Sequence, residues 1–210
     1  AVIWICFGMG LCVIANAGTS FLVTFFKNLG ITLTQGDVAK PNSIFECILD
    51  IIGIAIVPAI CEEFAMRCCA LGLLKNYGKA FGVVSVSVVF GLLHGNVIQF
   101  IFAFLVGLVL AYITIKTESI IPAMCIHALN NGMSAVSDTV NYAAGKEVNV
   151  TVGFFAFWLL VGIIATIYLA IMRKLTIPKD DGNCVLTLGE KVSSFFFPGM
   201  ILPFIVLIIM

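Results

Sequence analysis

The amino-acid sequence predicts an all-α protein, a polytopic bundle of transmembrane helices. Hydrophobic residues make up 61% of its 210 residues and charged residues only 10%, whereas soluble proteins carry about 25% charged residues. The apolar residues gather in runs about as long as the roughly 20 residues that span a bilayer core as a helix. Glycine, proline, asparagine and charged residues separate these runs. Lipid is therefore the expected solvent of most of the surface.

Seven apolar runs are candidates for membrane helices. They cover residues 1–26, 44–74, 80–94, 97–115, 122–136, 152–172 and 195–210. The run 44–74 is too long for one upright span, so we expect it to tilt or to break near Pro58. The runs 80–94 and 122–136 are short and carry polar residues, and unpaired polar groups are costly in lipid. We therefore expect these two helices inside the bundle.

The loops on the two sides of the membrane differ in positive charge. Seven lysine and arginine residues lie in the loops 75–80, 116–121 and 173–194, whereas three lie in the loops on the opposite side. Because cytoplasmic loops carry the excess of Lys and Arg, we expect these three loops in the cytoplasm. The loops are short and no soluble domain is evident, which suggests a prokaryotic plasma membrane. The segment 175–194 reads as an ordinary polar loop.

The chain reads as one integral membrane domain over residues 1–210, with a protease-like core at 44–137 formed by the second to fifth helices. It begins and ends inside apolar runs and lacks an initiator methionine, so we expect a sequence cropped at both ends. Basic and acidic residues number 11 each, which gives no indication of a nucleic-acid partner. The eight cysteines form no C-x-x-C pair and indicate no disulfide framework. No feature indicates an oligomeric state.

Three charged residues lie in the body of the second apolar run, namely Glu62, Glu63 and Arg67. A charge at this depth costs about 3 kcal/mol, so it needs a partner or a function. Glu63 and Arg67 are four residues apart on one helical face, which favours a salt bridge. Glu62 lies about 100° around the helix and has no basic residue three or four positions away. Its partner should come from another helix.

The two histidines of the chain both lie in the short runs. His94 ends the third run, and His127 lies in the fifth, four residues before Asn131. His127 and Asn131 should therefore share a helical face and reach one ligand. Counting about 1.5 Å per residue from the loop at 75–79 places both Glu62 and His94 about 20 Å into the membrane. A carboxylate and an imidazole at one depth can share a water molecule as general bases.

These residues fall into three motifs. Glu62, Glu63 and Arg67 form E-E-x-x-x-R, Phe90 and His94 form F-x-x-x-H, and His127 and Asn131 form H-x-x-x-N. In this order, over about residues 51–137, the motifs resemble those of the CPBP intramembrane proteases, the family of the Ras-converting-type CAAX prenyl endopeptidases. The resemblance implies a peptide hydrolase that cleaves membrane-associated substrates, of the prenylated CAAX or bacteriocin-leader type.

The resemblance also implies roles for single residues. Glu62 and His94 would activate the hydrolytic water, and His127 and Asn131 would form the oxyanion hole, each donor being worth about 3 kcal/mol. The remaining motif residues would support the structure; they are Glu63, Arg67 and Phe90. This mechanism requires no cofactor, and the partners it implies are a peptide or protein substrate and the lipid bilayer.

Other interpretations of the same residues stay open. Glu62, His94 and His127 could bind a divalent metal such as zinc, although the H-E-x-x-H motif is absent. The same three residues could form a proton or cation path in a transporter, since buried carboxylates and imidazoles also build relays. A relay, however, gives no reason for Asn131 beside His127. A catalytically silent scaffold or bacteriocin-immunity protein is a third interpretation, against which the intact motifs argue.

Overall fold

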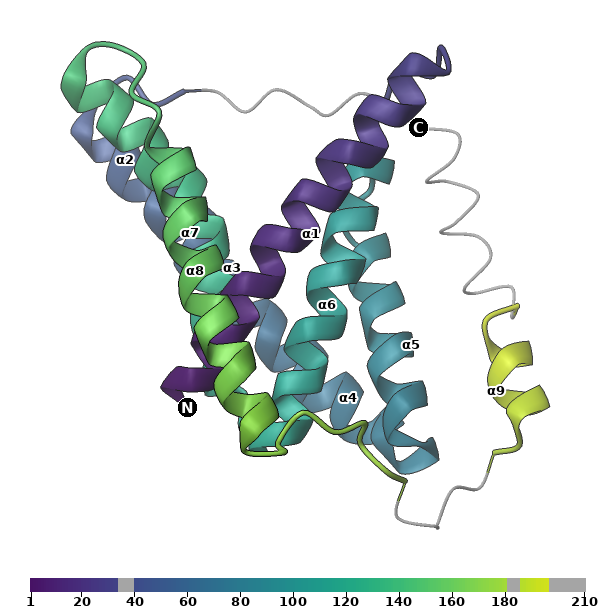
Figure 1. Cartoon of the computed structure of the whole chain (residues 1–210). Helices are drawn as coiled ribbons and strands as arrows, with labels where there is room; N and C mark the ends of the chain where they lie inside the picture. The colour runs from purple at the N-terminus through teal and green to yellow at the C-terminus, as the bar shows by residue number, and fades with distance from the viewer. Residues whose placement is uncertain (34–39, 181–185, 197–210) are drawn as a thin grey trace.

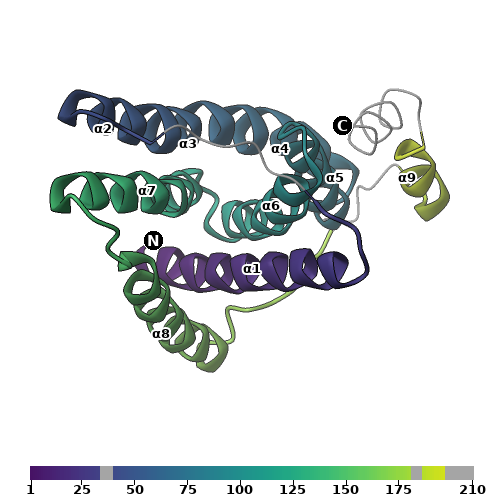
Figure 2. The same ribbon diagram turned by 90° about the horizontal axis from the view of Figure 1, so that it is seen from above.

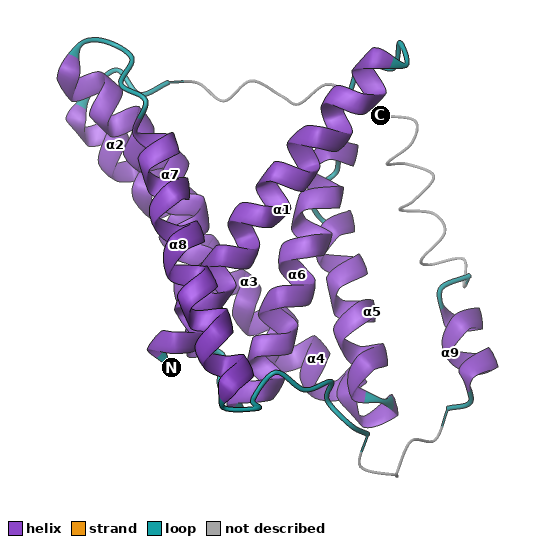
Figure 3. Cartoon of the chain, in the orientation of Figure 1, coloured by secondary structure: helices purple, strands orange, loops and turns teal. Residues whose placement is uncertain are grey.

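A computed structural model gives the structure of the protein, and it describes residues 1–33, 40–180 and 186–196. Every regular element in these ranges is a helix (Figures 1 and 3), so the predicted all-α fold class is confirmed. The α-helices are α1 (Val2–Asn28), α2 (Ile44–Asp50), α3 (Val57–Glu63), α4 (Leu71–Leu74), α5 (Lys79–Leu92), α6 (Val97–Thr117), α7 (Ile121–Ala144), α8 (Val150–Ile171) and α9 (Leu188–Ser194). Short turns of other helix types join α2, α3 and α4 into one continuous helix, Ile44–Tyr77.

Four helices are long and apolar enough to cross a membrane. They are α1, α6, α8 and the continuous helix Ile44–Tyr77. Their surfaces support the same conclusion, because large apolar side chains such as Phe21, Ile60 and Ile164 are more than half exposed. A contiguous exposed apolar surface of this kind requires lipid around it. The chain is therefore an integral membrane protein.

The two helices predicted to lie inside the bundle are α5 and α7. α5 has 14 residues and α7 has 24, so the prediction that the run 122–136 is a short helix was wrong. Beyond residue 136 the chain becomes polar but stays helical, because α7 packs against α2 and the turn that follows α2. Tertiary packing of this kind supplies most of a helix's stability. Gly145, in the left-handed conformation, ends α7.

The C-terminal part of the chain departs from the sequence-based expectation at one place. The segment 175–194 was expected to be a loop, yet α9 occupies its last residues. The signal for α9 is a capping box, in which Thr187 and Glu190 each accept a hydrogen bond from the other's backbone N–H. The bonds from Thr187 lower the pKa of the exposed Glu190 carboxyl. The predicted helix at 195–210 lies outside the described residues except for its first two.

The helices pack around two buried apolar clusters, a small one of Leu71, Val86 and Ala111 and a larger one. Side chains of α1, α6, α7 and α8 form it, among them Met9, Leu110, Ile126 and Leu169. Figures 1 and 2 show α1 between α6 and α8, with α5 on the far side of α6 and α7 beside α3. The connections after α4, α6 and α8 all lie at the lower end of Figure 1. Because these connections carry most of the lysine and arginine residues, we call this end the basic end.

The long helix continues through Pro58, so the expectation that it breaks near this residue was wrong. Instead, the six residues before α3, Ile51–Ile56, wind as a π-helix, and a second π-helical stretch, Phe64–Ala70, follows α3. In an α-helix the carbonyl of Ile54 would accept from the N–H of residue 58, and proline has none. The wider π turn keeps the chain helical around this missing donor. Single π turns of this kind are frequent at functional sites.

Candidate active site

Glu63 and Arg67 form the predicted ion pair in the interior of the bundle. Arg67 Nε lies 3.1 Å from Glu63 Oε2, and both side chains are fully buried. The contact is one of charge rather than an aligned hydrogen bond, since neither atom has a hydrogen-bond partner among the described residues. A buried charge of either sign would be costly alone. The pair therefore neutralises both residues within one helix.

The second oxygen of Glu63 has a function that sequence reasoning missed. Glu63 Oε1 accepts a hydrogen bond from His127 Nδ1 at 2.8 Å, which joins the long helix to α7. A carboxylate on one ring nitrogen of a histidine fixes the ring's orientation and places the proton on that nitrogen. Glu63 is thus a link between Arg67 and His127. The available signal was that a salt bridge to Arg67 leaves one carboxylate oxygen unused.

Glu62 finds its partner on another helix, as predicted. Its Oε2 lies 3.9 Å from His127 Nε2, and its side chain is 41% exposed. This distance is too long for a hydrogen bond. A water or substrate oxygen placed beside the gap can instead contact both atoms at about 2.8 Å. Glu62 therefore faces open space with His127 on one side of it.

Phe90 holds the site together from α5. Its side chain is only 3% exposed, and its ring packs edge-on against His94 at 5.1 Å and against His127 at 5.9 Å between ring centroids. The guanidinium carbon of Arg67 lies 4.6 Å above the same ring, a cation–π contact. The side chain that the F-x-x-x-H motif marks as a support thus contacts three of the other motif residues.

His94 lies in the turn that follows α5 and is oriented by the end of that helix. Its Nδ1 lies 2.8 Å from the carbonyl oxygen of Phe90. Because a carbonyl oxygen only accepts, Nδ1 must carry the proton, and Nε2 of the neutral ring is left as an acceptor. An acceptor nitrogen can take a proton from water. No hydrogen bond or ion pair joins His94 to Glu62 among the described residues; Phe90 and His127 connect them.

Asn131 lies one helical turn beyond His127, as its spacing predicts, and is held at two points. Its Nδ2 donates to the carbonyl of Ile54 at 3.3 Å, the carbonyl that Pro58 leaves without an α-helical donor. Its neighbour Asn130 donates from Nδ2 to Asn131 Oδ1 at 3.3 Å. These contacts use the amide oxygen and one N–H, and they leave one N–H of Asn131 for a ligand.

The alternative metal site receives no support from the positions of its residues. Among the described residues, no group of three or more His, Cys, Asp or Glu side chains is arranged to hold a metal ion. Glu62 and His127 are close, and both histidines use Nδ1, one on Glu63 and the other on a backbone carbonyl. These bonds leave Nε2 of each ring available to a ligand.

One comparison with known proteins identifies the segment that carries this site. Residues 44–133 match the family model described as type II CAAX prenyl endopeptidase Rce1-like. No curated protein and no solved structure matches the chain. The matched segment runs from α2 into α7 and contains all seven motif residues. This segment is therefore similar to the type II CAAX prenyl endopeptidases, which agrees with the resemblance that its three motifs indicate.

Proposed function

We propose that this protein is an intramembrane endopeptidase that hydrolyses peptide bonds with an activated water molecule. The observation that carries the proposal is the arrangement of two adjacent glutamates around one histidine. His127 is fixed through Nδ1 by the buried Glu63, while its Nε2 faces the half-exposed Glu62. A half-exposed carboxylate beside an oriented imidazole ring supports a general-base role for Glu62.

In the proposed reaction, water attacks the carbonyl carbon of the peptide bond. Glu62 takes a proton from the water, and His94 assists through Nε2, which its bond to the carbonyl of Phe90 leaves as an acceptor. The proton held by Glu62 then passes to the nitrogen of the leaving amine as the bond to carbon breaks. No covalent intermediate with the protein forms.

The oxyanion that develops on the carbonyl would be stabilised by Nε2–H of His127 and the free N–H of Asn131. His127 can donate from Nε2 only as an imidazolium, because Nδ1–H already faces Glu63. That form also balances charge, since two carboxylates then face Arg67 and one imidazolium. Preorganised donors of this kind are worth roughly 3 kcal/mol each.

The proposed substrate is a membrane-associated peptide or protein of the prenylated CAAX type, as the name of the matched family suggests. The basic end of the bundle would face the cytoplasm, because it gathers the loops at 75–80, 116–121 and 173–180. A cytoplasmic substrate anchored in the same membrane would then approach the site from that side. One of the four candidate membrane helices, Ile44–Tyr77, carries Glu62 and Glu63, which agrees with this mode of access.

Cleavage of a fluorescent prenylated peptide by the purified protein in vesicles tests the proposal. We expect Glu62→Gln and His127→Ala to abolish cleavage, and Asn131→Ala to lower kcat by about 10² to 10³, the cost of one oxyanion donor. Glu147→Gln is the matched control, since Glu147 is exposed and pairs with Lys40 at 3.3 Å, a contact of little value. Its activity should equal that of the wild type.

The same assay separates the metal alternative from the proposal. Activity should survive prolonged treatment with a strong chelator. Loss of activity in chelator, with recovery on addition of zinc alone, would contradict the metal-independent mechanism. Full activity of Glu62→Gln would contradict the proposal itself.

A further inference from the structure

α7 continues beyond the candidate active site with a row of polar side chains, which we call the polar stripe. It consists of Asn131, Ser134, Asp138 and Asn141, which follow His127 at spacings of four, three, four and three residues. Residues with this spacing lie on the same side of a helix. At about 1.5 Å per residue the polar stripe extends about 15 Å along α7. It thus begins one turn from His127 and leads away from the site.

The other sides of α7 have different surroundings. Gly132 lies against the long helix, where an added Cβ would be 3.4 Å from the Cβ of Ala55. Leu129 and Val136, seven residues apart, lie opposite the polar stripe and are 39% and 49% exposed. Exposed leucine and valine side chains on a helix of a membrane protein face lipid. α7 therefore borders lipid on one side at the level of the polar stripe.

The polar stripe is open on its own side. Ser134 is exposed, and the other three residues are partly exposed. The hydroxyl of Ser134 donates to the carbonyl of Asn131 at 3.0 Å, and the amide oxygen of Asn141 accepts from the backbone N–H of Val148 at 2.7 Å. No described residue forms a hydrogen bond or ion pair with the carboxylate of Asp138. Because an unpaired carboxylate in lipid is costly, this side of α7 requires water.

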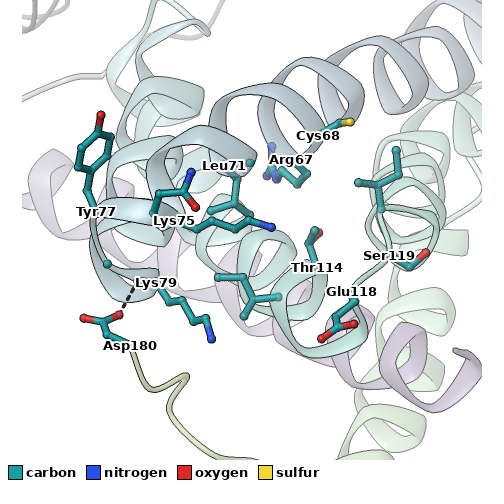
Figure 4. A pocket seen from close by; sticks show the side chains of 15 residues that line it. Arg67, Cys68, Leu71, Lys75, Tyr77, Lys79, Thr114, Glu118, Ser119 and Asp180 are labelled. Atoms are coloured by element: carbon teal, nitrogen blue, oxygen red, sulfur yellow. Dashed lines mark hydrogen bonds between the residues drawn. The ribbon is translucent and has the colours of Figure 1, made fainter. Parts of the chain in front are cut away.

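The polar stripe leads to the end of the bundle opposite the basic end. α7 begins at the basic end, where the residue before it, Ile120, lines a polar cavity of about 840 Å³ (Figure 4). Arg67 and Lys75 line this cavity as well, whereas the residues of the polar stripe do not. The polar stripe therefore lies on the far side of the site from this cavity and from the basic loops.

We propose that the polar stripe is hydrated and supplies the candidate active site with water from the end opposite the basic end. The inference rests on the proposed function, in which each cleaved bond consumes one water molecule. A substrate that approaches from the basic end would cover the site on that side, so water needs another route. The polar stripe provides it, because Asn131 is one turn from His127, whose Nε2 lies 3.9 Å from Glu62 Oε2. Its side chains offer water hydrogen-bond partners at successive turns.

The test measures hydration through the reaction of introduced cysteines with a charged methanethiosulfonate. The protein is placed in phosphatidylcholine vesicles with the reagent on both sides, in a background where the exposed native cysteines are serine. Ser134→Cys and Asp138→Cys are compared with Val136→Cys, the matched control on the lipid side of the same helix. We expect Val136→Cys to react about 10²-fold more slowly than the other two, because the thiolate is the reactive form and lipid disfavours it.

Cleavage of the prenylated peptide gives a second measurement. We expect Asp138→Leu to have a kcat about tenfold below that of Asp138→Asn at a similar KM, because the amide keeps the hydrogen bonds to water that leucine loses. Val136→Leu, a change on the lipid side, should keep the kcat of the wild type.

Equal reactivity of the three cysteines would overturn the inference. If all three react fast, the second half of α7 lies outside the membrane, and if all three react slowly, the polar stripe is dry. Equal kcat values for Asp138→Leu and Asp138→Asn would overturn the supply of water. If the wild type cleaves no peptide, the proposed function fails, and the labelling rates still decide whether the polar stripe is hydrated.

Discussion

At the scale of single residues, one step along a helix separates two glutamates into different environments. Glu63 is fully buried between Arg67 and His127, whereas the side chain of Glu62 is 41% exposed. The rotation of about 100° per residue is the cause, because only one of two neighbours can face the interior contact. The environment of each carboxylate suits the function proposed for it. The buried, paired carboxylate of Glu63 can orient His127, and the exposed carboxylate of Glu62 can exchange protons with water.

The two glutamates should therefore respond differently to the same substitution. We expect Glu63→Gln to lower both activity and thermal stability, because it leaves Arg67 as an unpaired buried charge, a loss of about 3 to 5 kcal/mol. Glu62→Gln should remove activity while the melting temperature stays near that of the wild type. Thermal unfolding in detergent, measured beside the cleavage assay, checks both. Equal melting temperatures for the two variants would contradict the structural assignment of Glu63.

At the scale of elements, the long helix Ile44–Tyr77 is irregular on both sides of its catalytic segment. The π-helical stretches Ile51–Ile56 and Phe64–Ala70 flank α3, which carries both glutamates. The first stretch presents the carbonyl of Ile54 to Asn131 on α7. A local irregularity that proline imposes on one helix thus positions a polar side chain of another.

Restoring the missing donor should disturb this arrangement. In Pro58→Ala the new N–H of residue 58 can bond to the carbonyl of Ile54 in a regular α-helix, and this bond competes with Asn131. We expect kcat to fall by about tenfold or more, up to the cost of an oxyanion donor, with the melting temperature unchanged or higher. Steady-state kinetics and thermal unfolding of the same preparations measure this. An unchanged kcat would show that the contact with Ile54 does not position Asn131.

The contact between α1 and α8 depends on two glycines. A Cβ at Gly162 would lie 2.5 Å from the Cα of Gly10, whereas one at Gly153 of the same helix would meet nothing within 4 Å. Small residues allow such close approach of membrane helices. We expect Gly162→Ala to lower the melting temperature and Gly153→Ala to leave it unchanged or raise it, since alanine favours helix by about 1 kcal/mol. Similar melting temperatures would argue against close packing of α1 on α8.

At the scale of the whole molecule, the charged residues of the bundle are concentrated in two regions, the motif residues of the site and the loops of the basic end. Long apolar helices face outward, the motif residues meet in the interior, and the basic loops gather at one end. Because cytoplasmic loops carry the excess of Lys and Arg in membrane proteins, we expect the basic end to face the cytoplasm. The same end holds the cavity that Arg67 and Lys75 line.

The orientation can be tested by labelling from outside. In a background where Cys61, Cys68 and Cys69 are serine, we expect Lys146→Cys to react with a membrane-impermeant maleimide in intact cells. Asn76→Cys, at the basic end, should react only after the membrane is opened. Labelling in the opposite order would reverse the proposed orientation, and labelling of both in intact cells would contradict the expected topology.

Much of the fold and part of the candidate site could be predicted from the sequence, because the signals for them are local. The apolar runs predicted where the helices up to residue 172 lie, apart from the end of α7, and the spacing of Glu63 and Arg67 predicted their ion pair. The loop prediction failed at α9, where a capping box was overlooked. The length of α7 could not be predicted, because its polar second half is helical only through packing against other elements.

The sequence by itself determined the fold class, the membrane location and the similarity to the CAAX endopeptidases, because each depends on residue types and their spacing along the chain. Only the tertiary structure decided that Glu63 orients His127, that Phe90 contacts both histidines and Arg67, and that Ile54 anchors Asn131. Apart from the local contact of Phe90 with His94, each of these contacts joins residues on different helices, and its existence depends on how the helices rotate and cross. A one-dimensional pattern fixes which face of a helix is polar, but packing selects the partner that this face meets.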